Sequence, residues 1–185
     1  MNDPEIWTIG HWTCPVGEFL RPLHQEGITL LVDVRAHPGS RRSPQFSGDA
    51  MAQWLGDAGI ASLHLPELGG RRRQQDVDPT ANAGWKNASF RNYADYTLTG
   101  GYEVGISRLT ALARERRTGV MCGEPMPWRC HRLLISNTLT VRGWTVWHLM
   151  GEAAPRRHRL GQWGAAPVMD ALERLTYPAS APHAS

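Results

Sequence analysis

Apolar residues fall along the chain in two alternating patterns, short continuous runs and longer segments with helical spacing. Residues 28–34 form a nearly continuous apolar run, which is typical of a strand buried on both faces. The segment 15–26 instead places Val16, Phe19 and Leu23 on one face of a helix, and Gly27 follows as its stop signal. By the same criteria we expect strands at 6–10, 28–34, 60–65, 119–122 and 144–150, and helices at 15–26, 47–58, 91–98, 102–116 and 131–141.

This alternation predicts the fold class. It favours a single Rossmann-like α/β domain, an open and mostly parallel sheet with helices on both faces. We place that domain at residues 1–150. Residues 151–185 are rich in Ala, Pro and Arg, and we expect a basic arm there that either packs on the domain or forms a loose tail, with one short helix at 168–175. The long polar connection at 69–88 is expected to be functional or disordered.

Length and composition narrow the class of protein. With 185 residues the chain is long enough for one domain with a substantial core. Three cysteines at irregular spacing are too few for a disulfide framework. No apolar run reaches the length of a membrane helix, and none resembles a signal peptide. We therefore expect a cytoplasmic protein that does not contact membranes.

The basic residues indicate an anionic partner. The formal net charge is only +3, but Lys86 is the single lysine, so nearly all basic residues are arginine. They cluster at 41–42, 71–73 and 156–159, where neighbouring glycine and proline predict loops. Planar guanidinium groups in loops suit the recognition of phosphate. A nucleotide or nucleic acid is therefore the expected partner.

Ionisable side chains follow the ends of four predicted strands. In chain order they are His11, Asp33 with Arg35, Glu67, and Cys122 with Glu124. Parallel strands bring their carboxyl ends to the same edge of a sheet, where ligands bind in open α/β folds, so we expect these side chains in one crevice. The fourth strand leads into a turn with two prolines that ends in Cys130-His131-Arg132, at the start of the next predicted helix.

Several strings of residues, in order along the chain, resemble the domain-of-unknown-function family numbered 488. They are Thr8-Ile9-Gly10-His11, Val32-Asp33-Val34-Arg35 with Pro38 and Ser40-Arg41, Leu65-Pro66-Glu67-Leu68-Gly69-Gly70-Arg71, Phe90-Arg91-Asn92-Tyr93-Ala94, Met121-Cys122-Gly123-Glu124 and Cys130-His131-Arg132. The resemblance runs from residue 7 to residue 150 and implies the domain and the site positions, while it supplies no reaction. The family usually has a small hydroxyl residue after its Gly-His pair. This chain has Trp12 there, so no role of that hydroxyl carries over.

The residues of the crevice suit an enzyme that cleaves a glycosidic or phosphodiester bond of a nucleotide or nucleic acid. Glu124 is the expected general base or nucleophile, with His11 or Asp33 as its partner in proton transfer. Cys122 is a further catalytic candidate. The expected binding residues are Arg35, Arg41, Arg71 and Arg132 for phosphate, together with Glu67, Tyr93 and Trp128.

Three other functions stay open at this point. Cys122, Cys130 and His131 are candidate ligands for zinc or iron, with haem as a minor case, but the cysteines lack the short spacing of structural zinc sites and no cofactor is assigned. The Cys122 loop is also similar to the anion loops of rhodanese-like transferases, although it carries the acidic Glu124 and its first arginine, Arg129, comes late. The third alternative is a domain that binds nucleic acid or a small anion without catalysis.

Overall fold

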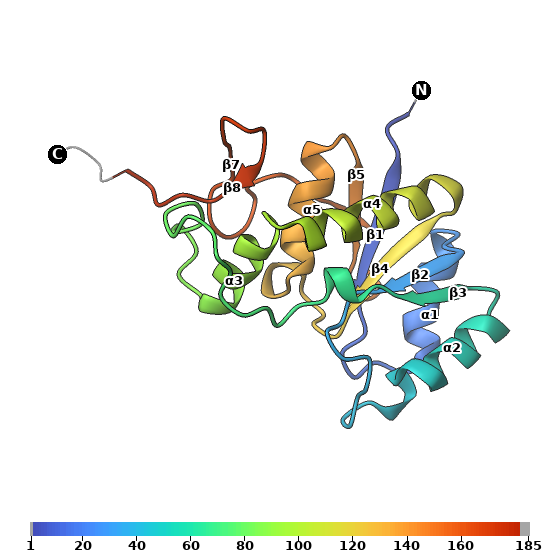
Figure 1. The fold of residues 1–185 in the computed structure, drawn as a ribbon. Coiled ribbons are helices and arrows are strands. Elements are labelled where there is room, and N and C mark those ends of the chain that lie inside the picture. The colour runs from blue at the N-terminus through green and yellow to red at the C-terminus, as the bar shows by residue number, and fades with distance from the viewer. Residues whose placement is uncertain (1, 182–185) are drawn as a thin grey trace.

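The computed structural model describes residues 2–181, and its centre is a six-stranded sheet in the order β3-β2-β4-β1-β5-β6 (Figure 1). The strands are β1 (Glu5–Gly10), β2 (Leu30–Asp33), β3 (Ala61–His64), β4 (Thr118–Cys122), β5 (Thr145–Leu149) and β6 (Arg156–Arg157). Neighbouring strands pair in parallel except for β6, which runs antiparallel to β5. The predicted open, mostly parallel sheet is confirmed, and each predicted strand lies within a few residues of its observed bounds.

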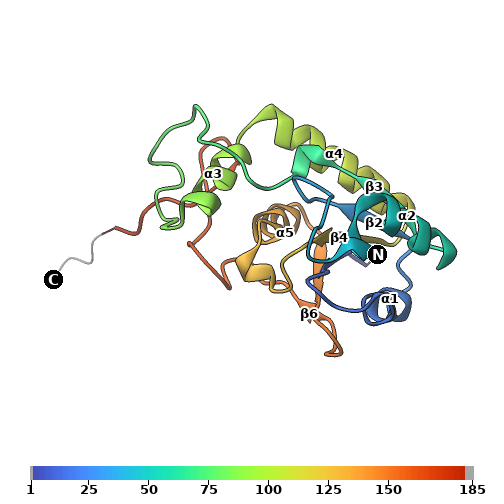
Figure 2. The same ribbon diagram turned by 90° about the horizontal axis from the view of Figure 1, so that it is seen from below.

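Helices cover both faces of this sheet (Figure 2). On one side lie α1 (Val16–Gln25) and α2 (Gly48–Asp57); on the other lie α4 (Gly100–Glu115) and α5 (Arg132–Val141), with α3 (Ala88–Tyr96) beside them. Three short 3-10 helices, η1 (Pro44–Phe46), η2 (Pro66–Leu68) and η3 (Pro127–Arg129), follow strand ends or precede helices. Within residues 2–181, no helix has the length and apolar character needed to span a membrane.

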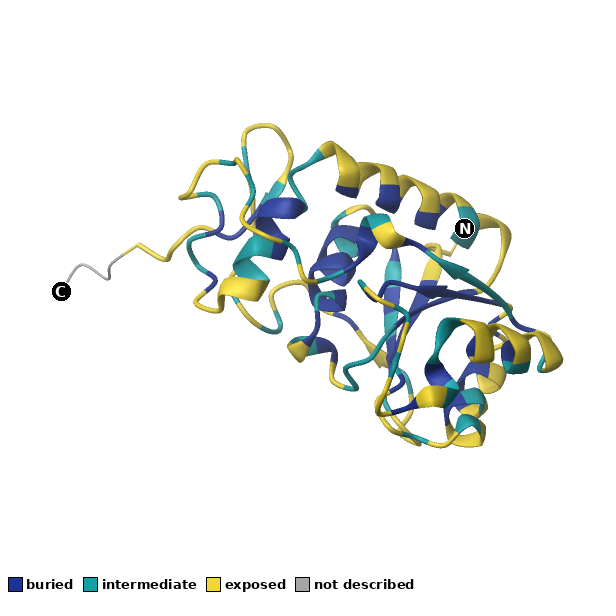
Figure 3. Cartoon of the chain, turned by 60° about the horizontal axis from the view of Figure 1, so that its bottom comes forward, coloured by how far each residue is buried: buried dark blue, intermediate teal, exposed yellow. Residues whose placement is uncertain are grey.

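Two central elements, β2 and α5, are the most deeply buried, and both bury polar residues. All four residues of β2 are buried, because helices pack on both faces of this central strand (Figure 3). Helix α5 is buried along its whole first two turns, including Ser136, Asn137 and Thr138. Polar groups inside a protein need hydrogen-bond partners. The Ser136 hydroxyl donates to the carbonyl of Arg132 at 2.7 Å, and the Thr138 hydroxyl is 2.8 Å from that of Tyr102.

The C-terminal segment packs on the domain. Through β6 it extends the sheet, and it contributes His158 and Tyr177 to the buried interior. The short helix predicted at 168–175 is wrong, because this stretch forms a hairpin of β7 (Val168–Met169) and β8 (Leu175–Thr176). The turn is set by the side chain of Asp170, which accepts hydrogen bonds from backbone N–H groups two and four residues ahead.

A chain of buried hydrogen bonds connects the sheet, α5 and the C-terminal segment. The hydroxyl of Thr8 lies 2.7 Å from Nδ1 of His148, Nε2 of His148 lies 3.0 Å from Nδ1 of His158, and Nε2 of His158 lies 2.8 Å from Oδ1 of Asn137. The amide of Asn137 donates to the hydroxyl of Tyr177 at 2.9 Å. Because Oδ1 of Asn137 can only accept, Nε2 of His158 donates to it; in neutral rings, Nε2 of His148 then donates to Nδ1 of His158, and Nδ1 of His148 accepts from Thr8.

This chain of buried hydrogen bonds predicts that the stability of the protein falls in mild acid. Burial lowers the pKa of His148 to about 3 and that of His158 to about 4, whereas the unfolded chain binds protons near the ordinary value of about 6.5. The stability that the neutral rings contribute is therefore present above about pH 6.5 and is lost as the pH falls toward about 4. From about pH 8 to about pH 5, we expect the free energy of unfolding in urea to drop by about 2 kcal/mol per histidine.

Replacing His158 with Gln should remove about half of that pH dependence, at the cost of lower stability at neutral pH. His37→Gln is the matched control, since His37 is exposed and outside the chain of hydrogen bonds. The control should show the same slope as the natural sequence. An unchanged slope in His158→Gln would mean that other groups cause the acid sensitivity.

Candidate functional site

The carboxyl ends of four strands lie side by side, and backbone hydrogen bonds continue past them. The N–H of His11 donates to the carbonyl of Cys122 at 2.9 Å, and that of Val34 donates to Met121 at 2.9 Å. On the other side of β2, the N–H of Leu65 donates to the carbonyl of Asp33 at 2.9 Å. The segments that follow β1, β2, β3 and β4 therefore start from one edge, which is where ligands bind in open α/β sheets.

A cavity of about 540 Å³ lies at this edge. Of the residues expected from the sequence, those that line it are His11, Arg35, Arg71, Tyr93, Cys122, Glu124, Cys130 and His131. Cys122 ends β4 and Tyr93 lies in α3, while the others come from the loops that follow β1, β2 and η2 and from the turn between β4 and α5. Segments far apart in sequence thus contribute ionisable groups to a single space.

Five other expected residues lie outside the lining of the cavity. Asp33 is buried in an ion pair, Arg41 is exposed on the surface, and Arg132 is buried beneath the cavity wall. Glu67 forms an ion pair of 2.7 Å with Arg108 of α4. Trp128 packs against Trp163 of the C-terminal segment, with 4.9 Å between the ring centroids.

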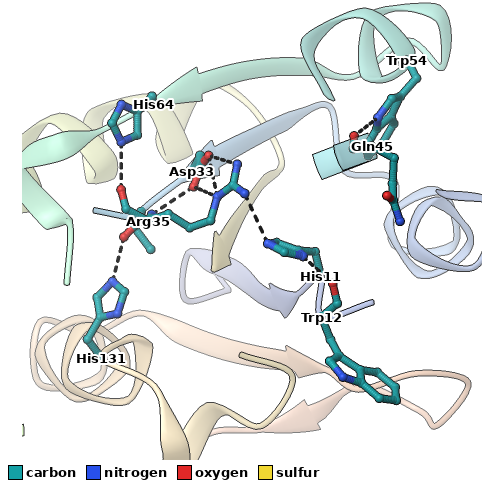
Figure 4. A network of polar contacts seen from close by, with 9 residues as sticks. His11, Trp12, Asp33, Arg35, Gln45, Trp54, His64 and His131 are labelled. Carbon is teal, nitrogen blue, oxygen red and sulfur yellow. Dashed lines mark hydrogen bonds and ion pairs between the residues drawn. The ribbon is translucent and has the colours of Figure 1, made fainter. Parts of the chain in front are cut away.

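Asp33, Arg35 and His11 form a network under one wall of the cavity (Figure 4). The guanidinium of Arg35 donates to both carboxylate oxygens of Asp33 at 2.7 to 3.0 Å, and its Nη1 lies 3.3 Å from Nε2 of His11. Nδ1 of His11 donates to the carbonyl of Trp12 at 2.7 Å, so Nε2 accepts from Arg35. Burial lowers the pKa of His11, and the charge of Arg35 adds to this effect, so the ring is neutral. This network holds the cavity wall in place.

Cys122, Cys130 and His131 gather on another wall. Their sulfur and Nδ1 atoms all lie within 4.8 Å of one another. Nδ1 of His131 is 3.6 Å from Sγ of Cys130 and 4.0 Å from Sγ of Cys122. The remaining ring nitrogen, Nε2, donates to the carbonyl of Val34 at 2.8 Å, which is also visible in Figure 4. These three side chains are the described residues that could hold a metal ion.

The two thiols have different environments. The pKa of Cys122 is raised well above its ordinary value because its thiol donates to Cys130 and because it is buried. Burial alone would raise the pKa of Cys130 as well. The hydrogen bond from Cys122 and the nearby charge of Arg132 oppose burial, and the pKa of Cys130 lies well below its ordinary value.

The burial of Arg132 also favours a negative charge on Cys130. This guanidinium is 1% exposed, and no carboxylate of residues 2–181 lies within ion-pair distance of it. Its Nε and its backbone N–H donate to Sγ of Cys130 at 3.4 and 3.5 Å. A buried cation without an anionic partner is very costly. The sulfur of Cys130 is the group that can supply that partner.

Two glycines allow the close contacts of this site. A Cβ atom on Gly10 would lie 2.0 Å from the carbonyl oxygen of Glu124, so the loop after β4 can touch β1 only because that side chain is missing. A Cβ atom on Gly70 would lie 2.8 Å from Nδ1 of His131. The second contact explains the Gly69-Gly70 pair in the otherwise polar connection 69–88.

Two guanidinium groups are free to bind an anion in the cavity. Arg71 and Arg129 both line it, and within the described part of the chain neither has an ion-pair partner. Arg71 has φ of 56°, a left-handed conformation that is unfavourable for a residue with a side chain. Such strain is often stored at functional positions. The cavity can therefore bind a phosphate or carboxylate group.

Arg129, Phe90 and Ser40 also line the cavity, although they were not among the site residues expected from the sequence. Arg129 had a usable signal, since it belongs to the same turn as Cys122 and Glu124. Phe90 lies in one of the strings that resemble the family. Ser40 had a signal too, since the pair Ser40-Arg41 is among the residues that resemble the family.

Comparison with known proteins identifies a family and no individual relative. A family model described as Domain of unknown function DUF488 matches residues 15–139. This range includes Arg35, Arg71, Glu124 and the three clustered Cys and His side chains, and it begins after His11. No curated protein and no solved structure matches the chain. The predicted membership of this family is thus confirmed over residues 15–139, and the family description names no reaction.

Replacing Arg71 with Gly should separate binding from stability. The change removes a guanidinium and relieves the left-handed backbone, so we expect the free energy of unfolding to stay constant or to rise by up to about 1 kcal/mol. The affinity for inorganic phosphate, measured by titration calorimetry, should fall by about tenfold because one charge-assisted contact is lost.

Glu173→Gly provides the matched control. Glu173 has φ of 58° but lies in the exposed turn between β7 and β8, away from the cavity. Its replacement should give the same gain in stability with no change in phosphate affinity. Equal phosphate affinity in both variants would exclude Arg71 from the anion site.

Proposed function

Because the chain belongs to the family Domain of unknown function DUF488, whose description names no reaction, we propose its function from the cavity itself. We propose that the protein is a hydrolase that cleaves a phosphodiester or glycosidic bond of a nucleotide or nucleic acid. The observation that carries this proposal is the meeting of two unpaired guanidinium groups and one carboxylate in a cavity of about 540 Å³.

The arginines would bind the phosphate. Arg71 and Arg129 offer planar, permanently charged donors that match phosphate oxygens in pairs. The third arginine of the lining, Arg35, is neutralised by Asp33, so its contribution to the field in the cavity is small. Two free charges suit one phosphate group better than a long nucleic-acid backbone, which favours a nucleotide or the end of a strand.

The size and lining of the cavity fit the rest of a nucleotide. Its volume lies in the usual range of small-molecule sites, about 300–1,000 Å³. Phe90 lines it and stacks on Trp85, with 4.9 Å between the ring centroids and 13° between the rings, so a base could extend this stack. The hydroxyls of Ser40 and Ser89 are available to sugar or base.

Glu124 would act as general base. It is the one carboxylate that lines the cavity, and no ion pair engages it within residues 2–181. In this proposal Glu124 accepts a proton from a water whose oxygen bonds to phosphorus or to the sugar carbon. The bond from that atom to the leaving group breaks, and the leaving group takes a proton from solvent. His11 and Asp33 are both bound to Arg35, and so we give them a positioning role.

Glu124 also supports hydrolysis over the alternative functions. A protein that only bound anions would be weakened by Glu124 in its binding site, since the carboxylate repels the ligand. A thiol-dependent transferase would need an accessible thiolate, whereas Cys122 keeps its proton and Cys130 is 4% exposed. Hydrolysis uses Glu124 and asks nothing of the thiols as nucleophiles.

Incubation with mononucleotides, cyclic nucleotides and short single-stranded oligonucleotides, followed by chromatography of the products, tests the proposal. Release of a base indicates glycosidic cleavage, and a new phosphate end indicates phosphodiester cleavage. Glu124→Gln should reduce turnover by at least about a hundredfold because the base is lost.

Glu115→Gln makes the same chemical change at the exposed end of α4 and should leave turnover unaltered. Two results would refute the proposal. One is the absence of any product from the whole panel, and the other is full turnover in Glu124→Gln.

A further inference from the structure

We infer that Cys122, Cys130 and His131 form a zinc site with three protein ligands, whose fourth position faces the cavity. The binding of the ion does not depend on the proposed function. The role of the ion in polarising the attacking water rests on the proposed function.

The distances fit a tetrahedral zinc ion. With Zn–S bonds of about 2.3 Å and Zn–N bonds of about 2.0–2.1 Å, tetrahedral geometry holds a sulfur and a nitrogen ligand about 3.6 Å apart. Sγ of Cys130 lies 3.6 Å from Nδ1 of His131. Sγ of Cys122 lies 4.0 Å from the same nitrogen, so a shift of about 0.4 Å brings this pair to the same separation. All three ligand atoms already lie within 4.8 Å of one another.

The orientation of His131 is the one that a metal ligand requires. Its Nε2 lies 2.8 Å from the carbonyl oxygen of Val34. That oxygen can only accept, so Nε2 carries the hydrogen, and in the neutral ring Nδ1 then presents its lone pair to the two sulfurs. Histidines that bind metals usually donate their second ring nitrogen to a carbonyl or carboxylate in this way.

The backbone around His131 also keeps this space clear. Gly70 packs so close to the ring that a Cβ atom there would lie 2.8 Å from Nδ1. The lone pair of Nδ1 therefore points toward a space bounded by two sulfurs and a glycine. Thiolate and imidazole ligands bind zinc in preference to harder cations.

The neighbours of Cys130 donate the hydrogen bonds that a thiolate ligand needs. Arg132 donates from Nε and from its backbone N–H to Sγ of Cys130, at 3.4 and 3.5 Å. Such hydrogen bonds hold the sulfur in place and offset its negative charge. The same contacts answer the question of what balances the buried guanidinium, so the cation and the metal ligand stabilise each other.

The fourth position is open. Among the residues that the structure describes, no further Cys, His, Asp or Glu joins this cluster. All three ligands line the cavity, so a water or a substrate atom can reach the ion. Three protein ligands with one open position are typical of catalytic zinc, whereas structural zinc is closed by four. A water bound there would be acidified and would be easier for Glu124 to deprotonate.

Cobalt substitution tests the binding of the ion directly. We expect protein purified without added metal to contain zinc at close to one equivalent, and the metal-free protein to bind one Co²⁺ with a thiolate charge-transfer band and the strong d–d bands of a four-coordinate site. Cys122→Ser and Cys130→Ser should each lose about half of the charge-transfer intensity. Each should weaken zinc binding by more than about a hundredfold. Even the loss of a hydrogen bond to a metal ligand lowers the affinity for the metal about ten- to a hundredfold.

Matched controls come from the same chain. Cys14→Ser removes the third cysteine, which lies outside the cluster, and should bind metal like the natural sequence. Gly70→Ala leaves both thiols intact but crowds Nδ1 of His131, so it should weaken zinc binding; Gly56→Ala, on α2 with no atom within 4 Å of the added methyl, should not. The Gly70 variant keeps the test valid if a cysteine variant fails to fold.

Three results would overturn the site. The first is no zinc in the purified protein together with no binding of added Co²⁺. The second is Co²⁺ binding that survives both cysteine changes. The third is an intact mass showing that Cys122 and Cys130 form a disulfide in freshly purified protein that added reductant does not make competent to bind metal.

The relation of the zinc ion to the reaction is tested separately. Glu124→Gln should keep the cobalt spectrum while losing turnover, because Glu124 is not a ligand. Binding of the ion without turnover of any nucleotide would leave the site standing and refute the proposed function. Full turnover by the metal-free protein would leave that function standing and refute the role of the ion.

Discussion

The interaction on which the site depends is the burial of Arg132. Its guanidinium is almost completely enclosed, and it donates to the sulfur of Cys130, the hydroxyl of Thr8 and the carbonyl of Glu124. A charge in such a place is tolerated only while these acceptors stay in position. The turn between β4 and α5 is therefore fixed to β1 from below, and Thr8 links it onward to the buried pair His148 and His158. The reactive groups of an exposed loop thus gain the rigidity of the core.

Much of the fold and the general position of the site follow from the sequence. A strand buried on both faces is almost entirely apolar, so β2 and β4 can be recognised without a structure. Once the strands are taken as parallel, the polar residues at their carboxyl ends must share one edge, and this predicts that His11, Arg35 and Cys122 lie together. The hairpin at 168–176 escaped prediction because each of its strands has two residues, too few for a strand pattern to be visible.

The direction of individual side chains did not follow from the sequence. Arg129 and Arg132 belong to one short turn, yet the first lines the cavity and the second is buried beneath its wall. The difference arises from partners distant in sequence, such as Thr8 for Arg132. Glu67 shows the same effect: it follows β3 as expected, but Arg108 of α4 pairs with it outside the cavity. Strand order brings residues to an edge, whereas tertiary contacts decide which of them face a ligand.

A single carboxylate among arginines is difficult to explain for an anion site by itself, because Glu124 repels the phosphate that Arg71 and Arg129 attract. Two thiols beside an imidazole are likewise hard to explain as nucleophiles, because a raised pKa keeps Cys122 protonated and Cys130 is buried. A divalent cation held by Cys122, Cys130 and His131 accounts for both observations. It gives the sulfurs a ligand role that requires no exposure, and it adds positive charge to the cavity that holds Glu124. In our proposals this one turn supplies both the metal ligands and the base, and the burial of Arg132 holds it in place.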